Sequence, residues 1–112
     1  MNNDKPICKV DERGTKRWYL NGKLHRVDGP AIEDTDGSKA WCLNGKRHRE
    51  DGPAIELADG DKYWYLNDKL HREDGPAIEH ADGSKAWYVD GEQIEVPDND
   101  TFLRMINLKA FW

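Results

Sequence analysis

The chain has 112 residues, of which 37% are hydrophobic and 35% are charged, and its formal net charge is −5 at pH 7. This length predicts a single domain, and the acidic balance argues against direct binding of nucleic acid. The hydrophobic content is low for a globular core, but five Trp and four Tyr argue against disorder. We therefore expect a fold in which neighbouring units bury thin apolar stripes against one another.

Signals for export, membrane insertion or metal binding are not evident in the sequence. The N-terminal stretch MNNDKPICKV lacks an apolar run, and no stretch approaches transmembrane length. Cys8 and Cys42 do not have the spacing of metal ligands. These features predict a reduced, cytoplasmic protein that holds no metal or cofactor and does not bind membranes.

A repeat of 23 residues organises the chain, and it is marked by Trp18, Trp41, Trp64 and Trp87. A fixed period of this length is typical of a solenoid or a hairpin array rather than a compact enzyme. The single domain, 1–112, divides as follows: a degenerate N-terminal repeat at 6–29, repeats at 30–52, 53–75 and 76–97, and a C-terminal helix at 100–112.

Two glycine turns punctuate each repeat and predict β-hairpins. In the second copy, Asp36-Gly37 and Asn44-Gly45 separate short runs of alternating polarity. Such dipeptides favour tight hairpin turns, because these turns need positive φ angles. We predict a mainly β fold: an elongated antiparallel meander of tandem β-hairpin repeats, forming a solenoid-like single sheet with a short C-terminal capping α-helix.

Two-residue turns would also fix which residues pair across the strands. On this assumption Ile32, Trp41 and His48 form one row, which we expect to be a buried aromatic stripe. Glu33 and Arg49 would lie on the opposite face, separated by a small residue.

Three His-Arg-x-Asp motifs, at 25–28, 48–51 and 71–74, resemble a repeated catalytic site. Equivalent residues of a linear array lie one repeat apart, however, and therefore do not converge on a metal or on a reacting group. The fourth copy has Ile94 at the His position, which favours a packing role and predicts that His48→Ile is tolerated. We predict that the protein is not an enzyme, and a metal-dependent enzyme is the least favoured alternative.

The C-terminal segment breaks the repeat and predicts a helix from Phe102 to Trp112, with Asp100 or Thr101 as its N-cap. This helix is too short to be stable alone and is apolar on more than one face. We expect it to cap the last repeat. Its second side would be buried in a homodimer or against a partner.

The candidate partner-binding residues lie on the face opposite the Trp row and on this tail. Tyr and Arg are frequent in the energetically dominant parts of protein interfaces. The alternative is that the Tyr side chains merely cover small neighbours on a solvated sheet. The candidates are Tyr19, Tyr65, Tyr88, Arg26, Arg49, Arg72, Phe111 and Trp112.

The string WCLNGKRHREDGPAIELADGDKY resembles a divergent MORN repeat. Trp41, the segment 44–48 and the segment 58–60 occupy matching places, and the resemblance covers roughly residues 6–96. An Arg follows each His, where the family has Gly. The variant NGKLHREDGPA is similar to short tandem-repeat proteins of bacteria and tailed phages. The resemblance implies an extended antiparallel sheet of stacked hairpins that serves as a protein- or lipid-binding scaffold without catalysis.

Two functions follow as hypotheses. The first is a non-enzymatic protein-interaction module or scaffold built on the MORN-like array. The alternative is a small acidic inhibitor, encoded by a phage, that binds and blocks a host nucleic-acid-handling defence complex in the host cytoplasm. In both cases we expect a protein partner, and for the inhibitor a basic or nucleic-acid-binding one.

Overall fold

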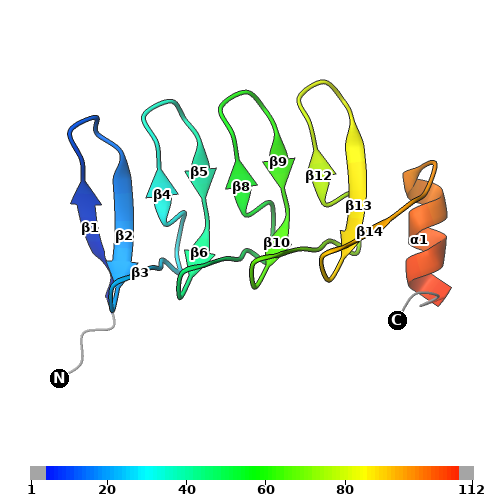
Figure 1. Ribbon diagram of the computed structural model, residues 1–112, viewed down its shortest axis with the longest axis horizontal. Helices are drawn as coiled ribbons and strands as arrows, with labels where there is room; N and C mark the ends of the chain where they lie inside the picture. The colour runs from blue at the N-terminus through cyan, green and yellow to red at the C-terminus, as the bar shows by residue number, and fades with distance from the viewer. Residues whose placement is uncertain (1–4, 109–112) are drawn as a thin grey trace.

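The repeats form a flat row of antiparallel hairpins that ends in one helix (Figure 1). The computed structural model describes residues 5–108. The molecule measures 47 × 35 × 18 Å, so it is a flat slab. The Asp-Gly loops follow one long edge of this slab, and the Asn-Gly turns follow the other.

The elements in chain order are β1 (Ile7–Val10), β2 (Lys16–Leu20), β3 (Lys23–Leu24), β4 (Ile32–Glu33), β5 (Lys39–Ala40), β6 (Cys42–Leu43), β7 (Lys46–Arg47), β8 (Ile55–Glu56), β9 (Lys62–Tyr63), β10 (Tyr65–Leu66), β11 (Lys69–Leu70), β12 (Ile78–Glu79), β13 (Lys85–Val89), β14 (Glu92–Ile94) and α1 (Asn99–Leu108). Within residues 5–108, a 10-stranded sheet runs β1-β2-β4-β5-β8-β9-β12-β13-β14, with β3 paired to β2. The pairs β6-β7 and β10-β11 form separate two-stranded sheets. The predicted mainly β meander with a capping helix is confirmed.

The Asp-Gly loop is one residue longer than the two-residue turn that the sequence suggested. Asp34 donates its N–H to the carbonyl of Ser38 at 2.9 Å, so the loop comprises residues 35–37. Gly37 has a φ of 97°, whereas Thr35 and Asp36 keep negative φ angles. This combination is typical of a type I turn followed by a left-handed glycine.

The longer loop changes the register in the larger sheet. Ile32 pairs with Ala40, and Glu33 pairs with Lys39. The predicted pairing of Ile32 with Trp41 is therefore wrong by one residue. Trp41 is consequently not part of the β4–β5 ladder, and the predicted continuous buried stripe does not form.

The Asn-Gly turns have the predicted length and type. Asn44 and Gly45 have φ angles of 52° and 80°, which are the two left-handed residues of a type I′ turn. The N–H of His48 accordingly donates to the carbonyl of Trp41 at 3.0 Å. The predicted pairing of Trp41 with His48 is confirmed.

Each Trp of the middle repeats stands where the chain leaves the larger sheet and enters its own lower hairpin. Trp41 lies between β5 and β6, and its N–H donates to the carbonyl of Ala54 in the next repeat at 2.7 Å. Trp64 bonds Ala77 in the same way at 2.8 Å. Both alanines are fully buried. The backbone of each Trp therefore joins its own hairpin to the following repeat.

The helix α1 begins earlier than the sequence suggested. The side chain of Asp98 accepts the N–H of Thr101 at 2.9 Å, and its carbonyl accepts the N–H of Phe102 at 3.2 Å. Asp98 is thus the N-cap, rather than Asp100 or Thr101. As a result, the first backbone hydrogen bonds of the helix form closer to the last hairpin than the sequence suggested.

Phe102 attaches the helix to the last repeat. It is fully buried against Trp87 and Val89, and Ile94 and Ile106 pack around this cluster. The indole Nε1 of Trp87 also donates to the side chain of Asn99 at 3.0 Å. The predicted capping role of the helix is confirmed for the described residues, whereas Phe111 and Trp112 lie outside them. No helix in the part that is described has the length and apolar character needed to cross a membrane.

Candidate functional site

In each of the first three repeats, an Arg stacks on the Trp of the same repeat. The distance from the guanidinium carbon to the ring centroid is 3.8 Å for Arg26 on Trp18, 3.7 Å for Arg49 on Trp41 and 3.9 Å for Arg72 on Trp64. Cation–π contacts of this kind contribute about 0.5–2 kcal/mol, depending on how far they are desolvated. The Arg therefore covers one face of an indole that the sheet leaves half-buried.

Three hydrogen bonds hold each of these guanidinium groups in place. In the second repeat, Nε of Arg49 donates to Asp51 at 3.2 Å, and Nη1 donates to the carbonyl of Pro53 at 3.0 Å and to Glu56 at 3.1 Å. The same set recurs one repeat earlier and one repeat later. The side chain of Arg49 is only 22% exposed. The three Arg residues predicted to bind a partner thus already support the repeat itself.

A glycine lies directly beside each of these stacked guanidinium groups. A Cβ on Gly52 would lie 3.0 Å from the guanidinium carbon of Arg49, and one on Gly75 would lie 2.8 Å from that of Arg72. Neither glycine has a positive φ. Space, rather than backbone conformation, therefore requires glycine here. We call this repeated unit the Trp–Arg–Gly sandwich.

The His side chains connect each repeat to the next. Nδ1 of His48 accepts the backbone N–H of Asn67, in the following turn, at 2.9 Å. Nε2 of the same ring lies 3.3 Å from Glu50. His25 and His71 accept the N–H groups of the next turns at 3.0 and 2.9 Å. The last repeat has no following turn, and this explains why Ile94 can take the His position.

The His-Arg-x-Asp motifs do not come together. Each motif serves its own repeat junction, through a His bond to the next turn and an Arg stack on its own Trp. Within residues 5–108, no group of three His, Cys, Asp or Glu side chains is arranged to hold a metal ion. Burial raises the pKa of the Cys42 thiol, which disfavours the nucleophilic thiolate.

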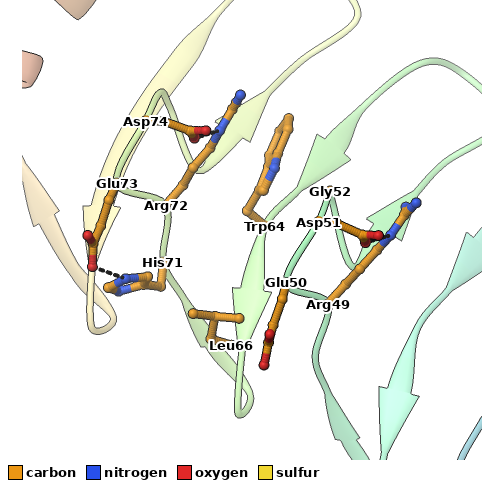
Figure 2. Close-up of a pocket in the computed structure, with 10 residues that line it drawn as sticks. All are labelled: Arg49, Glu50, Asp51, Gly52, Trp64, Leu66, His71, Arg72, Glu73 and Asp74. Atoms are coloured by element: carbon orange, nitrogen blue, oxygen red, sulfur yellow. Dashed lines mark hydrogen bonds and ion pairs between the residues drawn. The ribbon is translucent and has the colours of Figure 1, made fainter. Parts of the chain in front are cut away.

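Open clefts lie between successive sandwiches. The Trp64 cleft has a volume of about 590 Å³ and is lined by Arg49, Glu50, Asp51, Gly52, Trp64, Leu66, His71, Arg72, Glu73 and Asp74. The Trp41 cleft, of about 690 Å³, lies one repeat earlier and is lined by Arg26, Val27, Asp28, Gly29, Trp41, Leu43, His48, Arg49, Glu50 and Asp51. Figure 2 shows Trp64 standing between Arg72 on one side and the Asp51–Gly52 turn on the other. Both clefts thus have an indole and a leucine at their floor.

Carboxylates form the rims of these clefts. The side chains of Glu50, Asp51 and Asp74 are 81, 89 and 86% exposed. The cationic side chains that line the Trp64 cleft are Arg49 and Arg72, and each already contacts two carboxylates. The rim therefore presents an excess of negative charge to an incoming ligand.

The predicted Tyr residues contribute to neither of the two clefts. Tyr65 follows Trp64 along the strand, so its side chain points to the opposite face. There Arg47 covers it, with the guanidinium carbon 4.1 Å from the ring centroid. Lys9 lies 5.5 Å above the ring of Tyr19 in a similar way. The structure thus places the predicted Arg residues at the clefts and the predicted Tyr residues on a separate surface.

Sequence reasoning missed the cleft floors and the rim glutamates, Glu50 and Glu73. A usable signal was present in the spacing of the repeat. In the first three copies an Arg stands eight residues after the Trp, and a Gly stands eleven residues after it. The constant spacing of Trp, Arg and Gly could have indicated that the three residues are in contact. Only the loop lengths reveal that an open cleft lies next to this contact.

Comparison of the chain with protein-family models, curated proteins and solved structures finds no match.

Proposed function

We propose that this protein is a non-enzymatic interaction scaffold, a cytoplasmic MORN-like hairpin array whose clefts bind a protein partner. One observation carries the proposal: the same cleft, with an indole at its floor and carboxylates on its rim, occurs at two successive repeat junctions. A row of equivalent sites suits an extended partner better than one small substrate. Trp side chains that are held rigidly are also effective anchors in protein interfaces.

The experiment is a pull-down from a lysate of the source cells with the tagged chain and with a charge-reversed variant. Glu50→Lys and Glu73→Lys together change the rims while leaving the three sandwiches intact. Glu12→Lys, in the exposed loop between β1 and β2, lies outside both clefts and provides the control for charge reversal. We expect the partner to be captured by the chain and by the control, and to be lost with the double variant. Equal capture by all three proteins would refute the role of the clefts.

The exposed rim also supports a second candidate, a small acidic inhibitor encoded by a phage. Such a protein would occupy a basic surface on a host nucleic-acid-handling defence complex, where phosphates otherwise bind. We then expect the complex to weaken with added salt and to compete with DNA or RNA for the same partner. A partner that binds the chain and nucleic acid simultaneously, without mutual interference, contradicts this candidate.

The outer side of α1 supports a further part of the proposal, a homodimer formed through the helix. Leu108 is 78% exposed at the end of α1. Sedimentation measurements on the full chain and on Leu108→Glu test this contact. We expect a dimer that the substitution dissociates, and a chain that is monomeric at all concentrations contradicts it.

A further inference from the structure

We propose that the two clefts bind arginine side chains of an extended partner segment, so that two arginines three residues apart enter the Trp41 and Trp64 clefts together. This inference rests on the proposed function and specifies the chemistry of its ligand. It combines three independent features: the chemistry of each cleft, the contrast with the last repeat, and the distance between the clefts.

The composition of the Trp64 cleft suits a guanidinium group on an aliphatic stem. Trp64 and Leu66 provide the apolar lining, and Glu50 and Asp51 line the opposite side from the preceding repeat, where Asp51 is turned toward Arg49 and Glu50 lies beside Leu66. A guanidinium stacks on an indole and binds carboxylates with two parallel N–H groups, which an ammonium cannot do. The chain already uses this chemistry in its first three repeats, and in the third Arg72 combines a Trp face with carboxylates at 2.8 and 3.0 Å.

In the last repeat an apolar side chain packs against the Trp, beside a smaller cleft of about 450 Å³ that Arg72, Gly75 and Trp87 help to line. Phe102 covers Trp87, Val89 and Ile94, which stand 23 residues after the floor and wall residues Trp64, Leu66 and His71 of the Trp64 cleft. In the last repeat this wall is apolar, because Ile94 stands where His71 stands one repeat earlier. In the two open clefts, an apolar side chain would instead remove water from rim carboxylates without replacing their interactions, which is unfavourable. A cation offsets this desolvation, so charge complementarity favours arginine over phenylalanine.

The distance between the clefts sets the spacing of the arginines. The larger sheet advances by two strands per repeat, and strands lie about 4.8 Å apart, so equivalent points are roughly 10 Å apart. A polyproline II segment has three residues per turn and rises about 3.1 Å per residue, so every third side chain points the same way roughly 9 Å further on. A β-strand repeats its side-chain direction at about 7 or 13 Å. An Arg-x-x-Arg segment in the polyproline II conformation therefore matches the array.

The chain contains a natural comparison between its two clefts. Val27 occupies the position in the Trp41 cleft that Glu50 occupies in the upstream wall of the Trp64 cleft. Val27 is 79% exposed, so this position does not serve the packing of the repeat. Glu50→Val and Val27→Glu thus remove or add one rim carboxylate in a context that the chain itself tolerates.

The test is isothermal calorimetry with synthetic peptides and the full-length chain. The peptides contain Arg-Pro-Pro-Arg, Arg-Pro-Arg, Arg-Pro-Pro-Pro-Arg, Gln-Pro-Pro-Gln or Phe-Pro-Pro-Phe between identical neutral ends. We expect Arg-Pro-Pro-Arg to bind tightest. We expect Glu50→Val to weaken it by about two- to fivefold and Val27→Glu to strengthen it by a similar factor, as for one exposed ion pair. Glu12→Val should leave binding unchanged.

Equal binding of the three Arg peptides would overturn the inference, because it would indicate non-specific attraction to an acidic surface. Tighter binding of the Phe peptide, or no binding of any Arg peptide, would also overturn it. These outcomes are distinct from failure of the proposed function. A partner whose capture depends on Glu50 and Glu73, but which offers no arginine to the clefts, leaves the scaffold function intact and removes only the ligand chemistry.

Discussion

In each of the first three repeats a glycine leaves little space beside the stacked arginine, and this yields a prediction at the scale of single residues. Gly75→Ala places a Cβ 2.8 Å from the guanidinium carbon of Arg72, which must then shift from its stacked position on Trp64. We expect a loss of about 1–2 kcal/mol in the free energy of unfolding, from overpacking and the lost cation–π contact. Urea denaturation followed by Trp fluorescence measures this loss.

A double-mutant cycle with Arg72→Ala provides the control for this prediction. If the clash is the cause, Gly75→Ala costs far less once the Arg side chain is absent, and the two effects are strongly non-additive. Additive effects would show that Gly75 is required for another reason.

Asp68 yields a prediction about pH at the same scale. Asp68 has a φ of 70° and replaces the usual turn glycine, and Nε of Arg47 donates to it at 2.6 Å. This hydrogen bond lowers the pKa of Asp68 below its usual value. The carboxylate therefore stabilises the folded state above about pH 4, and this contribution is lost as the pH falls through the lowered folded-state pKa.

We therefore expect Asp68→Asn to be less stable than the parent chain at pH 7 and nearly equal to it once the pH lies below the lowered pKa of Asp68. Asn tolerates the left-handed conformation, so the substitution isolates the charge. Both side chains of the ion pair are more than 40% exposed, so the difference at pH 7 should stay within about 1 kcal/mol. A difference that persists at low pH contradicts the assignment to Arg47.

At the scale of the elements, the His bonds between hairpins reverse an expectation drawn from the sequence. Ile94 suggested that His48→Ile is tolerated, but Nδ1 of His48 accepts the N–H of Asn67 in the next hairpin. Ile cannot accept this bond, so we expect a loss of about 1 kcal/mol. His48→Asn, whose side-chain oxygen can take the place of Nδ1, should retain most of the stability. Denaturant titrations of both variants make the comparison, and equal losses would argue that ring packing dominates.

The hairpins themselves show which local features the sequence specifies. The Asn-Gly turns were predictable because both residues need a left-handed backbone, and this leaves one short turn type. The length of the Asp-Gly loops was not predictable, because Asp36-Gly37 is compatible both with a two-residue turn and with the end of a three-residue loop. The second alternative is realised, and it moves Ile32 opposite Ala40. One added residue was therefore enough to place Trp41 outside the β4–β5 ladder.

At the scale of the whole molecule, the period and the capping helix were predictable, and the clefts were not. The period follows from Trp18, Trp41, Trp64 and Trp87, which any linear array must place in a row. A cleft, in contrast, exists only between two repeats, and its walls come from segments whose distance depends on loop geometry. Glu50 and Glu73 therefore appear in the sequence as ordinary surface charges, and only the assembled array shows that they line the same cleft as an indole.

The array also predicts that a whole repeat can be removed. Deletion of residues 53–75 joins Gly52 to Pro76 and so recreates the Gly-Pro junction that occurs between the repeats. Because each repeat bonds only to its neighbours in the larger sheet, the shortened chain keeps the repeated strand pairings, turns and sandwiches with one copy fewer of each, and it loses the Arg47–Asp68 ion pair. We expect it to fold cooperatively, with lower stability and a smaller dependence of the unfolding free energy on urea, since less surface is exposed on unfolding.

Deletion of residues 64–86 serves as the control, because it also removes one period of 23 residues. This deletion joins Tyr63 to Trp87 within a hairpin, so that Trp87 takes the position of Trp64. Both deletions preserve the periodic register, so a chain governed by neighbour contacts should give nearly equal stabilities for the two. Circular dichroism and urea denaturation measure this equality. An unfolded product in either case would contradict it, because both deletions keep the two ends of the array and the contacts between neighbouring repeats would then not be sufficient for folding.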